Sequence, residues 1–235
     1  MKHNFLFVAV LFSTIFTVNA VAQTAGYVLY GNGPAGYTDL TGQVSVTALG
    51  TAAFESGVFT GAGLPGRICE SSNYLQLSFA AAQTMNLTDK FALHVVLQKD
   101  GEAADKVQVS FCKNGWNAAR ISWEIENASI AAGDASDIVL KYGDCRGEET
   151  DNWNSYNAST FIGEVEYPAA EIMRICAANG EKFAINAIYL EASYSGTTAI
   201  SSVSTDIKAT KTLRDGQLFI LRGNTLYDLN GNQVQ

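Results

Sequence analysis

Apolar and polar residues alternate through most of this chain, and that period of two limits the available folds more than any other feature. Successive side chains of a strand point to opposite faces of a sheet, so alternation predicts strands with one buried face. The alternating segments cover residues 26–30, 43–49, 74–79, 91–97, 106–112, 117–126, 138–142, 160–167, 171–177 and 182–194. Strands that follow one another without helical crossovers pair antiparallel. We therefore predict an all-β fold, an antiparallel β-sandwich of the jelly-roll kind over residues 24–196.

Two Asn-Gly dipeptides lie between alternating segments, and each of them predicts a hairpin. They are Asn114-Gly115 and Asn179-Gly180. A type I′ turn needs positive φ at both central residues, which asparagine and glycine tolerate. Each turn would therefore pair the alternating segment before it with the one after it.

The start of the chain has the layout of a secretory signal peptide, which we assign to residues 1–23. A basic start at Lys2 precedes an apolar run over residues 5–18, and Ala20 and Ala22 suit a signal peptidase. The apolar run is shorter than the about 20 residues that span a bilayer, so we do not expect an integral membrane protein. We expect the mature chain to be exported, and to be soluble or attached to a surface.

The chain is acidic, with a formal net charge of −8 and a pI of about 4.7. Nucleic-acid binding needs a basic footprint, so we expect no nucleic-acid partner. The same charge argues against electrostatic binding to an anionic membrane. Only 16% of the residues are charged while 47% are hydrophobic, a balance that favours strands joined by turns.

Four cysteines lie beyond the signal peptide: Cys69, Cys112, Cys145 and Cys176. Export to an oxidising compartment would permit two disulfides, in any of three pairings. Free buried thiols are the alternative. The wide spacing excludes the close pairs of a zinc site or a thioredoxin-like motif.

Catalysis has two candidate routes in this sequence. His94 is the one histidine of the mature chain, and its place within a strand favours a packed sheet residue over a catalytic base. Glu124 and Glu126 share one strand face about 6.6 Å apart, which suits the carboxylates of a glycoside hydrolase. Glu164 and Glu166 have the same spacing. Because a solvated acidic face explains both pairs more simply, we favour a protein without enzymatic activity.

Sugar binding is better supported, because aromatic and amide side chains gather in one loop. An aromatic ring stacks on the apolar face of a pyranose while neighbouring amides bond its hydroxyls. The candidate ligand-binding residues are Trp116, Asn152, Trp153, Asn154 and Tyr156. The alternative for Trp153 is a plug tucked under its own loop.

Acidic residues crowd the start of the same region. Asp144, Glu148, Glu149 and Asp151 could supply oxygen ligands to a structural calcium ion. Their spacing matches no EF-hand, and a solvated acidic loop is the simpler interpretation. We expect no other cofactor.

The C-terminal part of the chain differs in character from the rest. Residues 197–211 are mostly small and polar and are typical of a linker. Residues 212–235 contain two short alternating segments, 218–221 and 225–229. They predict a small β-meander, which is marginally stable alone.

This terminal element carries a recognisable pattern. Residues 226–234 read Leu-Tyr-Asp-Leu-Asn-Gly-Asn-Gln-Val, which is hydrophobic–Tyr–x–x–x–Gly–x–x–Val. The segment resembles the C-terminal sorting or anchoring element of proteins exported by the type IX secretion system. The resemblance implies secretion machinery as a partner, and a location outside or on the surface of a Gram-negative bacterium. An ordinary terminal hairpin packed on the sandwich is the alternative.

The body of the chain resembles carbohydrate-binding modules of the jelly-roll type. Residues 183–190, Phe-Ala-Ile-Asn-Ala-Ile-Tyr-Leu, are similar to the closing strand of such modules, where aromatic–x–Ile–Asp/Asn–x–Ile–x–Leu is common. The resemblance implies a non-catalytic protein that binds a glycan or a cell-surface polymer. The alternatives are a structural or adhesive surface protein without a small-molecule site, and a glycoside hydrolase that uses Glu124 and Glu126.

Overall fold

The computed structural model describes residues 25–64, 72–100, 106–131, 133–147 and 154–195, and the strand segments 210–214, 217–222, 225–227 and 233–234. The chain divides into two compact units, Met1–Tyr194 and Ser195–Gln235. Among the described residues, no helix has the length and apolar character needed to cross a membrane. The predicted signal peptide and most of the predicted linker lie outside the described residues.

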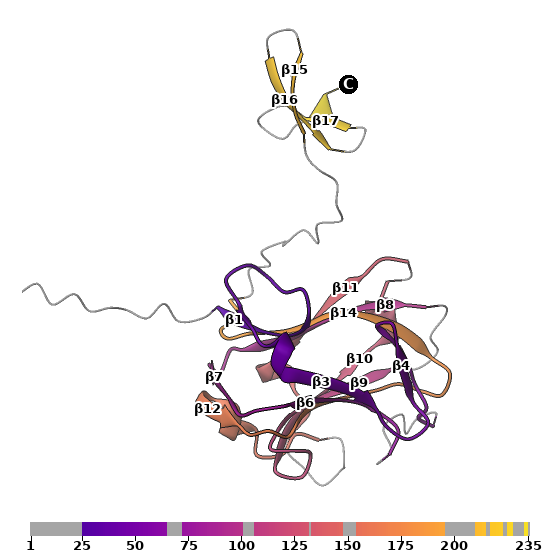
Figure 1. Cartoon of the computed structure of the whole chain (residues 1–235), viewed down its shortest axis with the longest axis vertical. Coiled ribbons are helices and arrows are strands. Elements are labelled where there is room, and N and C mark those ends of the chain that lie inside the picture. The colour runs from indigo at the N-terminus through magenta and orange to yellow at the C-terminus, as the bar shows by residue number, and fades with distance from the viewer. Residues whose placement is uncertain are drawn as a thin grey trace, which may run out of the picture. The chain divides into compact units, whose positions relative to one another are not determined.

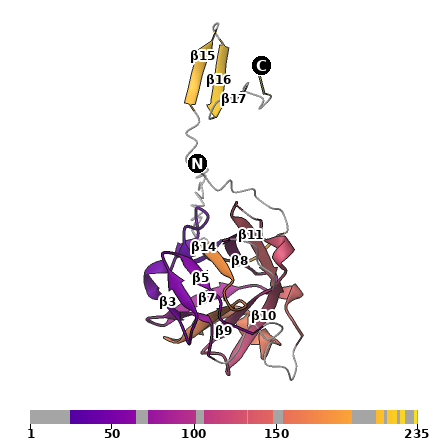
Figure 2. The ribbon, with the colours of Figure 1, turned by 90° about the vertical axis from the view of Figure 1, so that its right-hand side faces the viewer.

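The first unit is a β-sandwich whose two layers are visible in Figures 1 and 2. The strands are β1 (Gly26–Gly31), β2 (Thr38–Asp39), β3 (Val44–Ala48), β4 (Ala53–Glu55), β5 (Val58–Thr60), β6 (Leu75–Phe79), β7 (Gln83–Leu87), β8 (Ala92–Lys99), β9 (Val107–Lys113), β10 (Ala119–Ile125), β11 (Ser136–Lys141), β12 (Gly163–Tyr167), β13 (Glu171–Cys176) and β14 (Lys182–Glu191). One sheet has the order β11-β8-β14-β1-β2, with β5 also paired to β14 and β4 to β5. The other sheet has the order β10-β9-β13-β6-β3, and β12 and β7 form a separate pair. Short 3-10 helices lie between them: η1 (Thr41–Gln43), η2 (Asn127–Ser129), η3 (Tyr142–Asp144) and η4 (Ala158–Phe161).

The core lies between the two sheets and is built from the apolar members of the alternating segments. In β10, for example, Ile121, Trp123 and Ile125 are buried in the core. Six large aromatic side chains have less than 2% exposure: Phe59, Phe91, Phe111, Phe161, Phe183 and Tyr167. Burial of one such side chain stabilises the fold by about 1.5–3 kcal/mol. The strand pairs are antiparallel except for β1 with β2, which confirms the predicted all-β antiparallel class.

The first predicted hairpin is confirmed. Strands β9 and β10 pair in an unbroken antiparallel register from Lys113 with Ala119 to Val107 with Ile125. Asn114 and Gly115 both have positive φ, 60° and 84°, as expected of this dipeptide. Because Lys113 pairs with Ala119, however, the loop covers residues 114–118 and is longer than the predicted two-residue type I′ turn.

The second predicted hairpin is wrong. Strand β13 pairs with β6 and β9, whereas β14 belongs to the other sheet. The Asn179-Gly180 turn therefore carries the chain from one layer to the other. Its backbone is held by a third segment, because the amides of Asn179 and Gly180 donate to the carbonyls of Gly63 and Gly61. A dipeptide signal cannot reveal such a partner, which is more than a hundred residues away in the sequence.

Some strands lack a signal in the sequence, and one predicted strand begins late. Strands β2, β4 and β5 are two or three residues long, too short for alternation to be recognised. Strand β7 was not predicted either. The segment expected to extend from residue 160 begins as η4, and its strand β12 starts at Gly163, which has a φ of 91°.

Of the two alternatives for the cysteines, free thiols hold for Cys112 and Cys145, so the four cysteines do not form two disulfides. Cys112 is buried on the outer side of β9, whereas Cys145 packs against the core between the sheets. Cys176 is disulfide-bonded, and Cys69 lies outside the described residues.

The second unit is a four-stranded antiparallel meander in the order β15-β16-β17-β18. Its strands are β15 (Thr210–Arg214), β16 (Gln217–Arg222), β17 (Thr225–Tyr227) and β18 (Gln233–Val234). The meander predicted near the C-terminus is confirmed. It begins at Thr210 rather than Thr212, because Thr210 and Lys211 already pair with Leu221 and Ile220.

Candidate functional site

The outer face of the five-stranded sheet is polar along every strand. Polar side chains occupy most of the positions that alternate with the core, namely Ser45, Thr47, Gln76, Ser78, Arg174, Gln108, Ser110, Arg120, Ser122 and Glu124, and Cys112 and Cys176 lie on the same face. Ser110 and Ser122 are fully buried on this face, and their hydroxyls bond each other at 2.7 Å. A polar sheet face that is partly covered and internally hydrogen-bonded can support a binding site.

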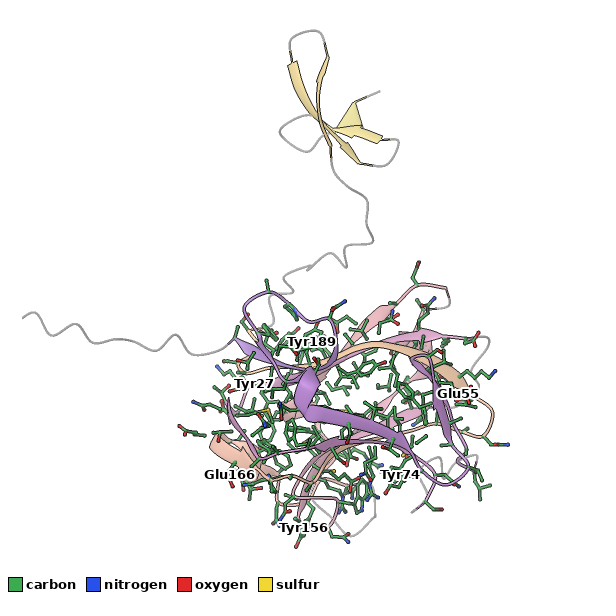
Figure 3. All side chains as sticks on the ribbon, viewed as in Figure 1. Tyr27, Glu55, Tyr74, Tyr156, Glu166 and Tyr189 are labelled. Carbon is green, nitrogen blue, oxygen red and sulfur yellow. The ribbon has the colours of Figure 1, made fainter. Side chains whose placement is uncertain are left out.

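Aromatic rings and guanidinium groups alternate in a row at one end of this face. The guanidinium carbon of Arg174 lies 4.2 Å from the ring centroid of Tyr74 and 4.4 Å from that of Trp116. The guanidinium carbon of Arg120 lies 4.6 Å from the Trp116 centroid and 5.8 Å from that of Tyr156. We call these five side chains the aromatic–arginine row. The residues at the two ends of the row, Tyr74 and Tyr156, lie on the same side of the sandwich in Figure 3.

A buried ion pair fixes the inner half of the row. Arg174 donates through Nε and Nη2 to the two carboxylate oxygens of Glu171, with 2.9 Å between Nη2 and Oε2. The side chains of Arg174 and Glu171 are 15% and 11% exposed. Burial acts to lower the pKa of Arg174, but the Glu171 carboxylate outweighs it and the pKa is raised. The same carboxylate accepts the backbone N–H of Trp116 at 3.3 Å, so it holds both the cation and the turn.

The outer half of the row is positioned by a short segment that adds to the free edge of β10. Arg120 and Tyr156 exchange backbone hydrogen bonds of 2.9 and 2.8 Å. The Arg120 side chain also donates from Nε to the carbonyl of Asn154 at 2.9 Å. The hydroxyl of the buried Ser155 accepts the backbone N–H of Ser122 at 3.3 Å. Asn157 adopts the left-handed conformation, with a φ of 53°, where the chain turns away from β10.

The structure brings together three of the sequence-predicted ligand-binding residues. Trp116, Asn154 and Tyr156 all contact Arg120, and the Tyr156 side chain is 47% exposed. Asn152 and Trp153 lie outside the described residues.

Sequence reasoning missed four members of this site: Tyr74, Arg120, Glu171 and Arg174. Arg120 and Arg174 are charged residues inside alternating strands, and that signal could have placed them on a polar sheet face. Nothing in the sequence, however, shows that the two strands bring both guanidinium groups to the ring of one tryptophan.

The glutamates considered for catalysis are engaged in ion pairs. Glu124 lies 3.1 Å from Lys106 Nζ and 3.3 Å from Arg146 Nη1, and it accepts a hydrogen bond from Gln108. Partial burial acts to raise the pKa of Glu124, but the hydrogen bonds and these cations together lower it. The side chain of Glu126 is 63% exposed and lies 3.2 Å from Lys106. A carboxylate held ionised in this way is poorly suited to act as a general acid.

His94 is a buried residue of the opposite sheet, as expected, and is 6% exposed. Its ring stacks on Tyr189 with 4.4 Å between centroids, and its Nδ1 lies 3.0 Å from Asp137 Oδ1. Nε2 is 3.5 Å from Glu191 Oε2, within ion-pair range, but it makes no hydrogen bond. Burial acts to raise the pKa of Asp137, yet the hydrogen bonds from His94 and Tyr189 lower it overall. Figure 3 places Tyr189 and Tyr156 on opposite sides of the sandwich.

The calcium prediction concerns a region that is only partly described. Asp144 ends η3 and is exposed, while Glu148, Glu149 and Asp151 lie outside the described residues. Within the described part of the chain, no three His, Cys, Asp or Glu side chains are grouped so as to hold a metal ion.

No protein-family model matches the sequence, and no curated protein matches it either. Among solved structures, PfGH50B is similar over 66% of this chain and 23% of its own, with 13% identity and a TM-score of 0.37. Two structures of the family 11 carbohydrate-binding module from Clostridium thermocellum have 11% and 10% identity, each with a TM-score of 0.34. They are matched over 64% of this chain and over 89% and 88% of their own, and one holds a β-1,3-1,4-mixed-linked tetrasaccharide. No residue role is transferred from these structures.

Proposed function

We propose that the sandwich binds a glycan or a related polymer, without catalysis, at the exposed end of the aromatic–arginine row. The observation that carries the proposal is Tyr156, a 47% exposed ring held by β10 beside a stacked guanidinium and Asn154. Such a ring offers an apolar face to a pyranose, and the amide and guanidinium offer hydrogen bonds to its hydroxyls. The surrounding backbone bonds keep these groups in place before a ligand arrives, which reduces the ordering cost of binding.

The charges at the site favour a neutral, hydroxyl-rich ligand over a strongly acidic one. Arg174 is already neutralised by Glu171, and the chain as a whole carries a net charge of −8. A polyanion would therefore meet an acidic protein in which the charge of Arg174 is already balanced. Hydroxyl groups can use donors and acceptors together, and both kinds are present.

The proposal is tested with an array of neutral oligosaccharides, followed by titration calorimetry on those that bind. Tyr156→Ala should weaken binding by about tenfold or more, which is about 1.4 kcal/mol. Leu64→Ala is the matched control, because Leu64 is the other large hydrophobic side chain that is exposed among the described residues. Binding that is unchanged in Tyr156→Ala would place the site elsewhere.

One structural observation favours a second candidate function. Most of the row is enclosed, since Tyr74 is 6% exposed and the Arg174–Glu171 pair nearly buried. The row would then serve to stabilise the fold of a structural or adhesive protein that has no small-molecule site. Absence of binding across the array, together with a large loss of stability in Trp116→Ala, would favour this second function.

Export and attachment form a separate part of the proposal. Residues 1–23 would direct export, and the terminal meander would act as a sorting or anchoring element recognised by secretion machinery. Fractionation of cells that express the chain with and without residues 210–235 tests this. Retention of the truncated protein in the same compartment as the full chain would contradict a targeting role.

A calcium ion in the loop that contains Asp144 is also retained as a proposal. Calcium that binds only the folded chain raises the melting temperature by mass action. The melting temperature is measured in roughly 1 mM Ca²⁺, which fills even weak calcium sites, and in roughly 1 mM EDTA, which empties them. The same melting temperature in both would contradict the proposal.

A further inference from the structure

Strand β3 is the last strand of the five-stranded sheet, and within the described residues no strand pairs with its outer edge. Its residues pair with β6 alone, in an unbroken antiparallel register centred on Val46 opposite Leu77. Figure 2 shows β3 at the left-hand edge of the sandwich. Hydrogen bonds flank this register, from the Leu49 amide to the Tyr74 carbonyl and from the Ala80 amide to the Gln43 carbonyl.

The alternation of these bonds shows which backbone groups face outward. In an antiparallel ladder, every second residue directs its N–H and C=O to the same neighbour. Because Gln43 and Leu49 are bonded to the β6 side, Ser45 and Thr47 face β6 as well. The N–H and C=O groups of Val46 and Ala48 and the C=O of Val44 therefore point away from the sheet, where a further strand would pair. The Val44 N–H is already bonded to the Thr41 carbonyl.

The edge of β3 lacks the features that keep strand edges apart. It has no charged residue, no proline and no bulge. Other sheet edges in the described part of the sandwich carry charges, with Asp137 on β11 and Glu55 on β4.

Two further strand edges are closed by other means. The edge of β10 is covered by its bridge to Tyr156. Strand β7 is uncharged too, but its Asn86 amide is bonded to the hydroxyl of Tyr27 at 2.8 Å.

We propose that β3 is the contact strand of a two-fold symmetric homodimer, in which it pairs antiparallel with β3 of a second copy. Centred on Val46, this register places Val46 opposite itself, Val44 opposite Ala48, and Ser45 opposite Thr47. The outward N–H and C=O of Val46 then form a reciprocal pair of hydrogen bonds across the axis.

A second copy fits this edge because of its charge. Two molecules of net charge −8 repel each other over most of their surfaces, and an uncharged strand is where they can approach. The adjacent side chains on the outer face, Gln76 and Ser78 of β6, are neutral as well. Polar hydroxyls of Ser45 and Thr47 would line the outer side of the contact.

The area of the contact is small, so the affinity of the dimer is low. A five-residue strand pair buries less than the roughly 1,000 Å² of a stable interface, so the dimer is reversible and depends on concentration.

The two-fold axis of an antiparallel pair is perpendicular to the sheet, so both outer faces lie on the same side of one continuous sheet. If the proposed function is correct, the dimer presents two sugar sites together and gains avidity for a polymer; the dimer itself does not depend on that function.

Sedimentation equilibrium of the full mature chain, without any ligand, tests the proposal. The wild type should show a monomer–dimer equilibrium within the range of roughly 10–500 µM in which weak interfaces associate. Ser45→Lys with Thr47→Lys should abolish it, because like charges then lie opposite one another at a close, non-hydrogen-bonded pair. Ser45→Glu with Thr47→Glu should also be monomeric, and an equimolar mixture of the two double variants should dimerise again.

Two further variants keep the test decisive. Thr84→Lys with Asn186→Lys adds the same charge at exposed strand positions away from β3 and should dimerise like the wild type. Ala48→Pro removes one outward donor without adding charge and should weaken the dimer even if the lysine variant does not fold. A wild type that stays monomeric throughout, a dimer unaffected by the β3 variants, or a mixture that stays monomeric would each overturn the proposal.

Discussion

The guanidinium carbon of Arg120 lies 4.6 Å from the ring centroid of Trp116, and Nη1 of the same arginine donates to the Trp116 carbonyl at 3.3 Å. One side chain thus holds both the ring and the backbone of the turn that precedes β10. The same guanidinium reaches Asn154 and Tyr156 on the other side. Arg120 therefore joins the turn after β9 to the segment that closes the edge of β10.

Replacement of this arginine by lysine should loosen the closing segment. Arg120→Lys keeps the charge but loses the planar group that stacks on Trp116 and donates to two carbonyls. We expect the backbone amide of Tyr156 to exchange with solvent about three- to tenfold faster, as follows from the loss of about 1 kcal/mol of local stability. Hydrogen-exchange mass spectrometry measures this. Lys141→Arg, at a cation that lies 5.4 Å from the Tyr194 ring on the opposite sheet, should leave that exchange rate unchanged.

Loss of the Glu171 carboxylate should strongly destabilise the sandwich. In Glu171→Gln the enclosed Arg174 guanidinium loses its bidentate carboxylate partner, and an uncompensated buried charge costs about 3–5 kcal/mol. Urea denaturation measures the change in the free energy of unfolding. Glu126→Gln is the matched control, because it removes a carboxylate from an exposed ion pair and should cost less than about 1 kcal/mol. Equal effects of the two substitutions would contradict the assigned role of Glu171.

The Asp137 carboxylate should make stability depend on acid pH. Its pKa is below the ordinary value of 3.8 in the fold, so its bonds to His94 and Tyr189 stabilise the protein above that value. This contribution is lost as the pH falls through the lower, folded value. Asp137→Asn should cost about 1 kcal/mol at pH 7, a figure reduced for a side chain that is 40% exposed. Thermal unfolding at a series of pH values should show the difference shrinking below pH 3.8; a constant difference would argue against the mechanism.

The two free cysteines should differ sharply in reactivity. Burial raises the pKa of the Cys112 thiol well above its ordinary range, and reactivity requires the thiolate. Cys145 is partly exposed. In the native protein, iodoacetamide should therefore label Cys145 while Cys112 stays unmodified until urea unfolds the chain. Mass spectrometry of the labelled peptides detects both, and rapid native labelling of Cys112 would contradict its burial.

Removal of the terminal meander should leave the sandwich intact. The two units are separately compact, so a chain that ends at Tyr194 should melt within about 2 °C of the full chain. Differential scanning calorimetry gives the comparison. A drop of more than about 5 °C would mean that residues beyond 194 stabilise the sandwich.

Local patterning was enough to predict most of the sandwich strands. A segment such as 117–126 reports its own buried face, because alternation is a property of adjacent residues. The Asn114-Gly115 turn likewise needs only the conformational freedom of two residues. Both predictions depend on interactions within about ten residues of sequence, and for that reason they hold.

The candidate site was predicted only in part. Trp116, Asn154 and Tyr156 were recognisable as aromatic and amide side chains in turns and loops. Their common neighbour Arg120 was not, because a charged residue in a strand shows its face but not its contacts. The wrong hairpin at Asn179-Gly180 has the same cause, since strands adjacent in sequence can belong to different layers.

The sequence by itself determined the period-two strands, the acidic surface and the separate terminal meander, since each follows from composition or from neighbouring residues. Only the tertiary structure decided that β13 and β14 lie in different sheets, and that the guanidinium groups of Arg120 and Arg174 both lie over the Trp116 ring. It also left β3 without a second partner strand among the residues that the structure describes. These features depend on which distant strands pair, and pairing is chosen by the burial of the whole core rather than by any one segment.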